Sequence, residues 1–207
     1  MRKRILLPVF LTLLALVLCA CGEKTPSEVV DEAAVAFQNQ DTAALSELYN
    51  GKVDLESFFT QEDSSSELEA EAFKALADKL CDFDYEILDE TIDGDTAKVE
   101  VKLTTYDFAT VANGTMSQVF TTAFSMVFSD DEFDDSKTEE LFNTVLLGKL
   151  GEQTEKTKTA TIAIPLTRTE SGWKIDKLSK DETFLDALSG GGYSAMKNFE
   201  DNLSALE

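Results

Sequence analysis

The chain of 207 residues carries 40 acidic and 18 basic residues and no histidine, which gives a formal net charge of −22 at pH 7. A surface this acidic is repelled by nucleic-acid phosphates, so we expect no nucleic-acid partner. The lack of histidine excludes histidine-activated nucleophiles, histidine general bases and histidine-ligated metal sites.

The first twenty residues have the layout of a secretory signal. Arg2, Lys3 and Arg4 precede an apolar run from Ile5 to Leu18, and a basic start followed by a short apolar core is typical of such signals. As a helix this run reaches about 21 Å, less than the roughly 30 Å hydrocarbon core of a bilayer. A stable transmembrane span is therefore the weaker interpretation.

The end of this segment, Leu18-Cys19-Ala20-Cys21, resembles the lipobox of bacterial lipoproteins. The resemblance implies cleavage between Ala20 and Cys21 and a diacylglyceryl thioether on the Sγ atom of Cys21. Two acyl chains hold a protein stably on a membrane, whereas one holds it only marginally. The alternative is a plain signal peptide that is cut elsewhere and leaves Cys21 free.

These features predict a signal peptide over residues 1–20, a lipidated tether over 21–25 and one domain over 26–207. The domain would be held on the extracytoplasmic face of the cell membrane. Loss of the three basic residues of the signal would change the net charge from −22 to −25.

Cys81 is the single cysteine left unmodified in that scheme, so we expect no intramolecular disulfide. Its neighbours Leu80 and Phe83 favour a buried, inert thiol. Zinc and iron–sulfur sites need several thiolates, so we expect neither a metal nor another cofactor.

Three helices are expected before the first strand. Thr25-Pro26-Ser27-Glu28 has the pattern of a capping box with proline at the first helical position. Asp41 can cap a second, short helix, and apolar residues at helical spacing predict a third from about Ser66 to Leu80.

From Asp82 the apolar period changes from helical to two. Asp93-Gly94 is a tight-turn signal between two alternating runs, which predicts a β-hairpin. The buried face would be formed by Phe83, Tyr85, Ile87, Ala97, Val99, Val101 and Leu103.

A helical insertion is predicted over about 108–151, as an α-hairpin between strands. Its first helix carries a long stripe of apolar residues that includes Val111, Phe120 and Phe124. The acidic run from Asp130 to Asp135 joins the two helices. Its oxygen atoms suit calcium, but it lacks the spacing of an EF-hand loop, so a solvated loop is the favoured interpretation.

The chain then returns to β-structure from Thr159 to Thr169, where Pro165 predicts an edge position or a bulge. Ser171-Gly172-Trp173-Lys174-Ile175 forms a further strand. Asp181 can cap a short helix, Gly190-Gly191-Gly192 ends it, and Tyr193 to Leu206 has the pattern of a C-terminal helix.

The N-terminal helices, the run from Ile92 to Ala97 and the Ser171–Ile175 strand together resemble bacterial lipoproteins with a nuclear-transport-factor-two-like (cystatin-like) domain. The resemblance covers about two thirds of the chain after residue 20. It implies an α+β fold in which a curved antiparallel sheet packs on N-terminal helices as a cone, here with an inserted α-hairpin and a C-terminal helix. Several such families have no known function, and the cone hosts enzymes, binding proteins and inert scaffolds alike.

Four residues are candidates for lining a pocket in that cone: Tyr85, Tyr106, Trp173 and Arg168. Arg168 is the only arginine after residue 20. On the inner face of a strand it can hold an anion, and at the rim it would pair with a surface acid. The three aromatic residues suit either a pocket wall or a simple core.

The expected function is non-catalytic binding of a small molecule or a protein by a lipid-anchored protein. One alternative is a carboxylate-dependent enzyme in the cone, which needs an acid of raised pKa facing a cavity. The other is a docking lipoprotein that uses the phenylalanine-rich hairpin. A hollow cone with a buried acid would favour the enzyme, and a filled cone or an apolar pocket would favour binding.

Overall fold

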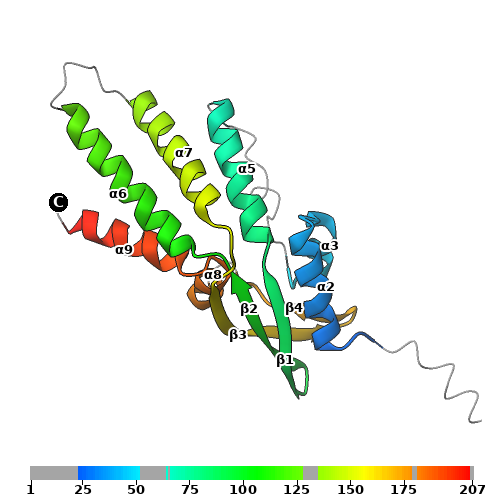
Figure 1. The fold of residues 1–207 in the computed structure, drawn as a ribbon. Helices are drawn as coiled ribbons and strands as arrows, with labels where there is room; N and C mark the ends of the chain where they lie inside the picture. Colours follow the sequence, from blue (N-terminus) through cyan, green and yellow to red (C-terminus); the bar gives the residue numbers. More distant parts are fainter. Residues whose placement is uncertain (1–22, 52–63, 65, 128–134, 179–180, 206–207) are drawn as a thin grey trace, which may run out of the picture.

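A computed structural model of the chain describes residues 23–51, 64, 66–127, 135–178 and 181–205 (Figure 1). The predicted signal peptide, Ala20 and Cys21 lie outside these residues, and so does the acidic run up to Asp134. The described elements are α2 (Pro26–Gln38), α3 (Thr42–Leu48), α5 (Glu67–Cys81), β1 (Asp84–Asp93), β2 (Thr96–Thr105), α6 (Phe108–Val127), α7 (Asp135–Glu152), β3 (Lys158–Thr169), β4 (Gly172–Ile175), α8 (Glu182–Leu188) and α9 (Gly192–Ser204). The predicted α+β class is confirmed.

The sheet is antiparallel with strand order β1-β2-β3-β4. The predicted hairpin turn is present: Asp93 pairs with Thr96, and Gly94 has φ +60°, a left-handed conformation that glycine adopts without strain. Val99 and Val101 of β2 pair with Ile164 and Ile162 of β3, and all four side chains are buried. The sheet therefore has one apolar face, as the alternation predicts.

The β1 strand contains an irregularity that the sequence pattern does not predict. The register with β2 shifts between Ile87 and Asp89, and the intervening Leu88 is left exposed. Because side chains alternate along a strand, one extra residue moves the following ones to the opposite face. Glu90 is thereby half-buried, and its carboxylate accepts a hydrogen bond of 2.8 Å from the backbone of Ser27 at the start of α2.

Pro165 lies where β3 changes from an interior to an edge position. β4 pairs with β3 only from Leu166 to Thr169. The backbone N–H of Asp176 donates a hydrogen bond of 3.0 Å to the Pro165 carbonyl. Proline has no N–H to donate, but Pro165 lies beyond the residues that pair with β4, so no hydrogen bond of that ladder is lost. In the register with β2, Pro165 pairs with Lys98 without a bulge.

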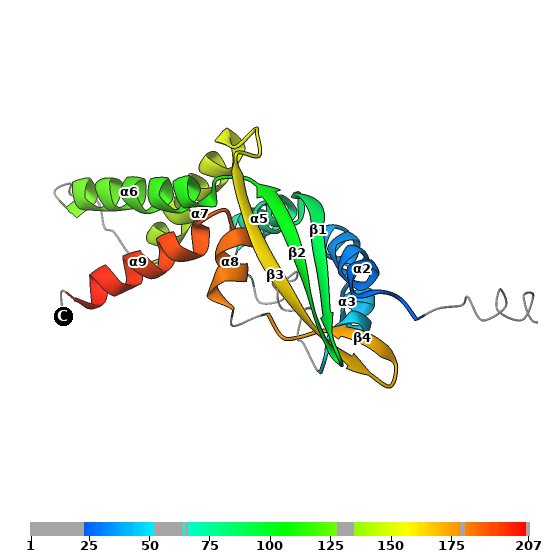
Figure 2. The ribbon, with the colours of Figure 1, turned by 90° about the horizontal axis from the view of Figure 1, so that it is seen from below.

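Helices α2, α3 and α8 cover the apolar face of the sheet and form the cone (Figures 1 and 2). The capping box at Thr25 and Glu28 is present, and Asp41 and Asp181 cap α3 and α8 as predicted. The core of this unit joins helix and sheet side chains: Val29, Val30, Ala33, Ala36, Leu45, Phe83, Ala97, Val99, Val101, Leu103, Ile162, Ile164, Leu166, Trp173, Ile175, Leu178, Ala187 and Leu188.

The remaining long helices, α5, α6, α7 and α9, form a separate layer beyond one end of the sheet (Figures 1 and 2). Its base is a smaller apolar cluster of Tyr106, Phe108, Val111 and Leu150. This layer contains the predicted hairpin insertion, and α5 and α9 flank it. None of the described helices is both long enough and apolar enough to cross a membrane.

Candidate functional site

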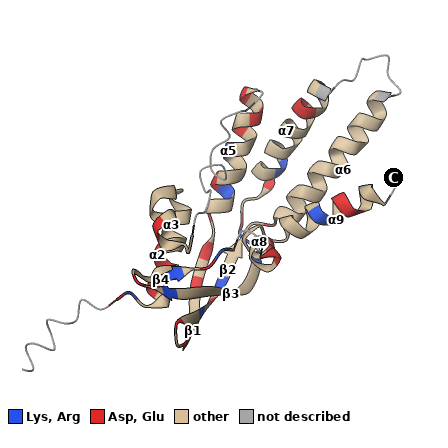
Figure 3. Cartoon of the chain, turned by 180° about the vertical axis from the view of Figure 1, so that it is seen from behind, with Lys and Arg blue, Asp and Glu red and all other residues tan. Residues whose placement is uncertain are grey.

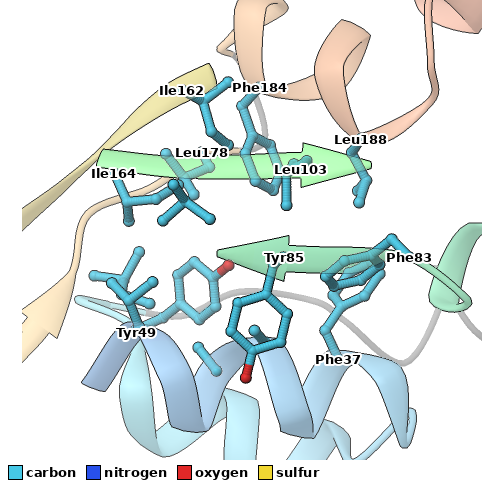
Figure 4. A pocket seen from close by; sticks show the side chains of 15 residues that line it. Phe37, Tyr49, Phe83, Tyr85, Leu103, Ile162, Ile164, Leu178, Phe184 and Leu188 are labelled. Carbon is cyan, nitrogen blue, oxygen red and sulfur yellow. The ribbon is translucent and has the colours of Figure 1, made fainter. Parts of the chain in front are cut away.

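The interior of the cone is nearly filled by side chains. The space left between α2, the sheet and α8 has a volume of about 60 Å³, far below the range of about 300 to 1,000 Å³ usual for small-molecule sites. Figure 4 shows aromatic and aliphatic side chains from both sides, among them Phe37, Phe83 and Phe184, pointing toward one another across it.

Of the described side chains that line this space, the polar ones are those of two tyrosines. Tyr85 donates a hydrogen bond of 2.7 Å to the carboxylate of Asp31 on α2, and burial, with that contact, raises the pKa of Tyr85 to about 12. Burial alone raises the pKa of Tyr49 to about 12. Among the described residues that line this space there is no carboxylate. The arrangement supplies no group that titrates near neutral pH.

The four candidate pocket residues do not line one pocket, and only Arg168 and Trp173 lie beside each other. Tyr85 lines the small space inside the cone. Trp173 is buried in the core, and Arg168 lies at the rim with its guanidinium 5.4 Å from the Trp173 ring. Tyr106 belongs to the base of the helical layer, where its hydroxyl donates to Asp82 at 2.7 Å.

A much larger cavity lies in the helical layer. It has a volume of about 510 Å³, and α5, α6, α7, α8 and α9 all contribute to its wall. Its lining is mostly apolar: Glu69, Phe73, Leu76, Leu80, Phe108, Val111, Ala112, Thr115, Met116, Phe142, Asn143, Leu146, Leu185, Leu188, Ser189, Gly192, Tyr193 and Met196.

The chain connections orient this cavity. Cys81 at the end of α5 leads directly into β1, and Phe108 at the start of α6 follows directly from β2. Leu80 and Phe108 therefore lie at the sheet end of the cavity, which we call the floor. Glu69 lies twelve residues before Cys81 on the same helix, about 18 Å along its axis, at the end of the cavity away from the sheet.

Few polar groups interrupt the apolar wall. Asn143 of α7 and Thr115 of α6 are buried, and the Thr115 hydroxyl has no hydrogen-bond partner among the described residues. Ser189 bonds the carbonyl of Leu185 and the backbone of Tyr193, so it is satisfied at the α8–α9 junction. The wall is therefore suited to an apolar molecule.

Cys81, the last residue of α5, carries a buried free thiol, as predicted. Burial, and then the charge of Asp78, raises its pKa to about 11, so it is held as the thiol at neutral pH. In the described part of the chain, no group of three or more cysteine and acidic side chains is placed to hold a metal ion.

Sequence reasoning missed this cavity as a site. The available signals were the apolar stripes on the third helix and on the hairpin, together with Met116 and Met196, whose flexible side chains suit irregular apolar surfaces. Each stripe predicts a core face, and only the spacing between the packed helices shows that the faces leave a space.

The sequence matches no protein-family model and no curated protein. Among solved structures, a "putative lipoprotein (ycdA)" from Bacillus subtilis subsp. subtilis str. 168 is similar, with a TM-score of 0.41 and 12% sequence identity. The match covers 81% of this chain and 47% of that protein, so the chain spans about half the length of the structure it resembles.

Proposed function

We propose that the protein is a lipoprotein, anchored through Cys21 on the extracytoplasmic face of the membrane, that binds a small apolar molecule without chemically changing it. The observation that carries the binding proposal is the cavity of about 510 Å³ in the helical layer, beside a cone that retains only about 60 Å³. The anchor rests on the lipobox-like sequence before Cys21.

The lining of the cavity supports binding over catalysis, because most of it is apolar. A carboxylate-dependent enzyme needs an acid that faces the cavity and whose pKa is raised toward neutrality. Asp78 and Asp82 do not line the cavity, and hydrogen bonds from Lys74 and Lys156 lower their pKa values.

The anchor is tested by replacing the modified cysteine. Cys21→Ala removes the only sulfur that the proposed thioether can use, so the protein should appear in the medium instead of the membrane fraction. Cys19→Ala is the matched control, because that residue leaves with the signal and the variant should stay anchored. A Cys21→Ala protein that remains in the membrane fraction would contradict the proposal.

The cavity is tested by filling it. The intact protein, held in phosphatidylcholine nanodiscs, is titrated with 1-octanol in a calorimeter, and empty nanodiscs provide the blank. Ala112→Phe adds a ring to the α6 wall and should abolish the protein-specific heat. Gln118→Phe adds the same ring to an exposed position of α6 and should leave it unchanged.

A folding measurement and a smaller substitution show whether Ala112→Phe fails to bind octanol because it fills the cavity or because it unfolds. Thermal melting by circular dichroism shows whether Ala112→Phe still folds, and Ala112→Leu provides a smaller filler that should weaken binding if the larger one unfolds the protein. Equal heats for the unmodified protein and the folded Ala112→Phe variant would rule out the cavity as the binding site.

A second candidate function is favoured by the outer face of α6. The 20 residues of this helix include no charged side chain (Figure 3). Phe120 and Phe124 on it are 55% and 67% exposed, and the Phe120 ring lies 6.0 Å from the Phe199 ring of α9. Two copies of so acidic a chain repel each other least across a face without charge, where no like charges come close together. The partner that fits this face is therefore a second copy, with α6 packed on α6.

Chemical cross-linking of the anchored protein in membranes tests that candidate. Phe120→Ser combined with Phe124→Ser should remove a cross-linked dimer without affecting octanol binding. A protein that is monomeric at every membrane density would contradict it.

A further inference from the structure

The wall of the helical-layer cavity contains a buried amide. Asn143, halfway along α7, lines the cavity and is 6% exposed. Its side chain offers two N–H donors and a carbonyl acceptor, yet it forms no hydrogen bond with any residue that the structure describes. A buried amide without a partner costs free energy, so in folded proteins such a group is normally paired with protein, solvent or ligand.

The Asn143 amide is open to the cavity. The side-chain oxygens that are fully enclosed and unpaired among the described residues belong to Thr105 and Thr115, and the amide atoms of Asn143 are not among them. The amide therefore retains accessible surface. Because the cavity is the open space that Asn143 lines, its donors and its acceptor can be reached by a molecule bound there.

The other polar side chains of the described wall are either engaged or out of reach. Glu69 already has an interaction partner within the chain, Ser189 donates to a backbone carbonyl of α8 at 2.8 Å, and Tyr193 donates to a carboxylate of α8 at 3.5 Å. The Thr115 hydroxyl is fully enclosed, so a ligand in the cavity does not contact it. Asn143 is thus the side chain of the described wall that remains able to bond a ligand.

Apolar surface adjoins this amide on α7. Phe142 and Leu146, on either side of Asn143 in the sequence, line the same cavity. Leu150 belongs to the same apolar cluster as the floor residue Phe108, and it lies seven residues after Asn143, about 10 Å along the axis of α7. A molecule bonded to the amide therefore has room for an apolar body between that bond and the floor.

The loss of water from the amide determines which molecules suit the cavity. A molecule that fills the space beside Asn143 displaces water from the amide, which then loses its hydrogen bonds unless the molecule replaces them. A hydroxyl group can accept from the amide N–H and donate to the amide carbonyl, whereas a hydrocarbon can do neither. A second polar group on the ligand would face apolar side chains and remain unpaired.

We propose that the cavity takes an apolar molecule that carries one hydroxyl group, with the hydroxyl bonded to the amide of Asn143 and the apolar body directed to the floor. This inference rests on the proposed function and deepens it by naming the ligand class. Asn143 is then the residue that distinguishes an alcohol from an apolar molecule of equal size.

Two isomeric probes separate the hydroxyl from the apolar body. 1-Octanol and heptyl methyl ether contain the same atoms, but the ether has no O–H donor. The intact protein in phosphatidylcholine nanodiscs is titrated with each probe in a calorimeter, with empty nanodiscs as the blank. We expect octanol to bind about fivefold more tightly than the ether, because the ether leaves the Asn143 carbonyl unpaired.

Two asparagine variants locate this preference. Asn143→Leu removes the amide and keeps a similar volume, so it should weaken octanol binding about tenfold and give octanol and the ether equal affinities. Uptake of each probe by the lipid is the same for all variants and cancels when they are compared. Asn113→Leu makes the same change at an exposed position of α6 outside the cavity and should leave the preference unchanged.

Thermal melting shows whether Asn143→Leu folds. Replacing an unpaired buried amide by an apolar group of similar size should not lower the melting temperature. Asn143→Ala removes the amide without placing a branched side chain in the wall. It should abolish the preference for octanol in the same way if Asn143→Leu unfolds.

The outcomes distinguish this inference from the function on which it rests. If the two probes bind equally, Asn143→Leu changes neither and Ala112→Phe abolishes both, the cavity binds apolar molecules but the hydroxyl preference is wrong. If neither probe binds the unmodified protein, the proposed function itself fails. If Asn113→Leu reduces the preference as much as Asn143→Leu, the hydroxyl does not bond Asn143.

Discussion

Glu23 and Arg168 form a two-pronged ion pair that joins chain positions 145 residues apart. The guanidinium Nε donates to Glu23 Oε1 at 3.1 Å, and Nη2 contacts Oε2 of the same carboxylate. The guanidinium also stands over the ring of Trp173. Glu23 follows the proposed lipid site at Cys21 by two residues, so this pair fixes the point at which an anchored chain would leave the sheet.

The Glu23–Arg168 ion pair should make the stability of the fold fall at acidic pH. A hydrogen bond from Arg168 lowers the pKa of Glu23 below its ordinary value of 4.5. A carboxyl group with a lowered pKa in the folded state stabilises the protein above its ordinary pKa, and this contribution is lost as the pH falls through the lowered value. We expect Glu23→Gln to lower the melting temperature slightly at pH 7, because exposed pairs contribute little.

The measurement is thermal melting of both proteins from pH 7 to pH 3. The difference between them should shrink as the pH falls below 4.5, because protonation of Glu23 removes its charge from the pair. Glu170→Gln, on the adjacent turn between β3 and β4, should show no such convergence. A constant difference across the range would mean that the carboxylate charge does not stabilise the fold.

Replacing each of two glycines by alanine should change the free energy of unfolding in opposite directions. Gly190, at the junction of α8 and α9, has φ +52°, and a Cβ atom there would lie 2.0 Å from the carbonyl oxygen of Tyr106. Gly190→Ala should therefore lower the free energy of unfolding by at least about 2 kcal/mol. Gly148, exposed within α7, has nothing within 4 Å of that position, so Gly148→Ala should raise it by about 0.5 to 1 kcal/mol.

Urea unfolding of the two variants measures whether the free energy of unfolding falls in Gly190→Ala and rises in Gly148→Ala. Gly190→Ala should also weaken octanol binding, because its neighbours Ser189 and Gly192 line the cavity. An unchanged stability in Gly190→Ala would show that the α8–α9 junction shifts without cost.

Local chemistry made much of the fold predictable from the sequence. The capping box at Thr25 needs only four adjacent residues, and the turn at Gly94 needs only a glycine between two alternating runs. The buried face of β2 follows from the alternation of apolar residues alone. These features depend on neighbours in the chain, so the sequence displays them directly.

The bulge at Leu88 and the helical-layer cavity could not be predicted in the same way. The shift at Leu88 is fixed by pairing with β2 and by the contact of Glu90 with Ser27, 63 residues away. The cavity depends on how far apart five helices pack. The spacing of apolar residues in the sequence does not show this distance. Arg168 was predictable only in part. The sequence allows either an anion-binding role or an ion pair at the rim, and it does not identify the partner, because Glu23 lies 145 residues away.

A stabilising substitution in the cavity wall is predicted at Thr115, whose hydroxyl has no hydrogen-bond partner among the described residues. A buried hydroxyl without a hydrogen bond costs free energy that an isosteric methyl group does not. Thr115→Val should raise the free energy of unfolding by about 1 kcal/mol and leave octanol binding intact. Thr121→Val is the control, since the exposed Thr121 hydroxyl bonds the carbonyl of Ser117 at 2.8 Å and its loss should change stability by less than about 0.5 kcal/mol. A destabilised Thr115→Val protein would show that the hydroxyl has a partner after all.

Thiol reactivity connects the buried Cys81 with the proposed anchor. The pKa of Cys81 is raised to about 11 from an ordinary value of 9.0, so at pH 8 it carries about a hundredfold less thiolate than an unperturbed thiol. The native, membrane-extracted protein should therefore not react with Ellman's reagent at pH 8, and guanidinium unfolding should release one equivalent of the coloured thiolate. Cys81→Ser should release none in either state if Cys21 carries lipid. If the native protein releases one equivalent rapidly and Cys81→Ser still does so, the reacting thiol is a free Cys21, which would contradict the anchor. If this release is absent in Cys81→Ser, the Cys81 thiol is accessible in the folded state.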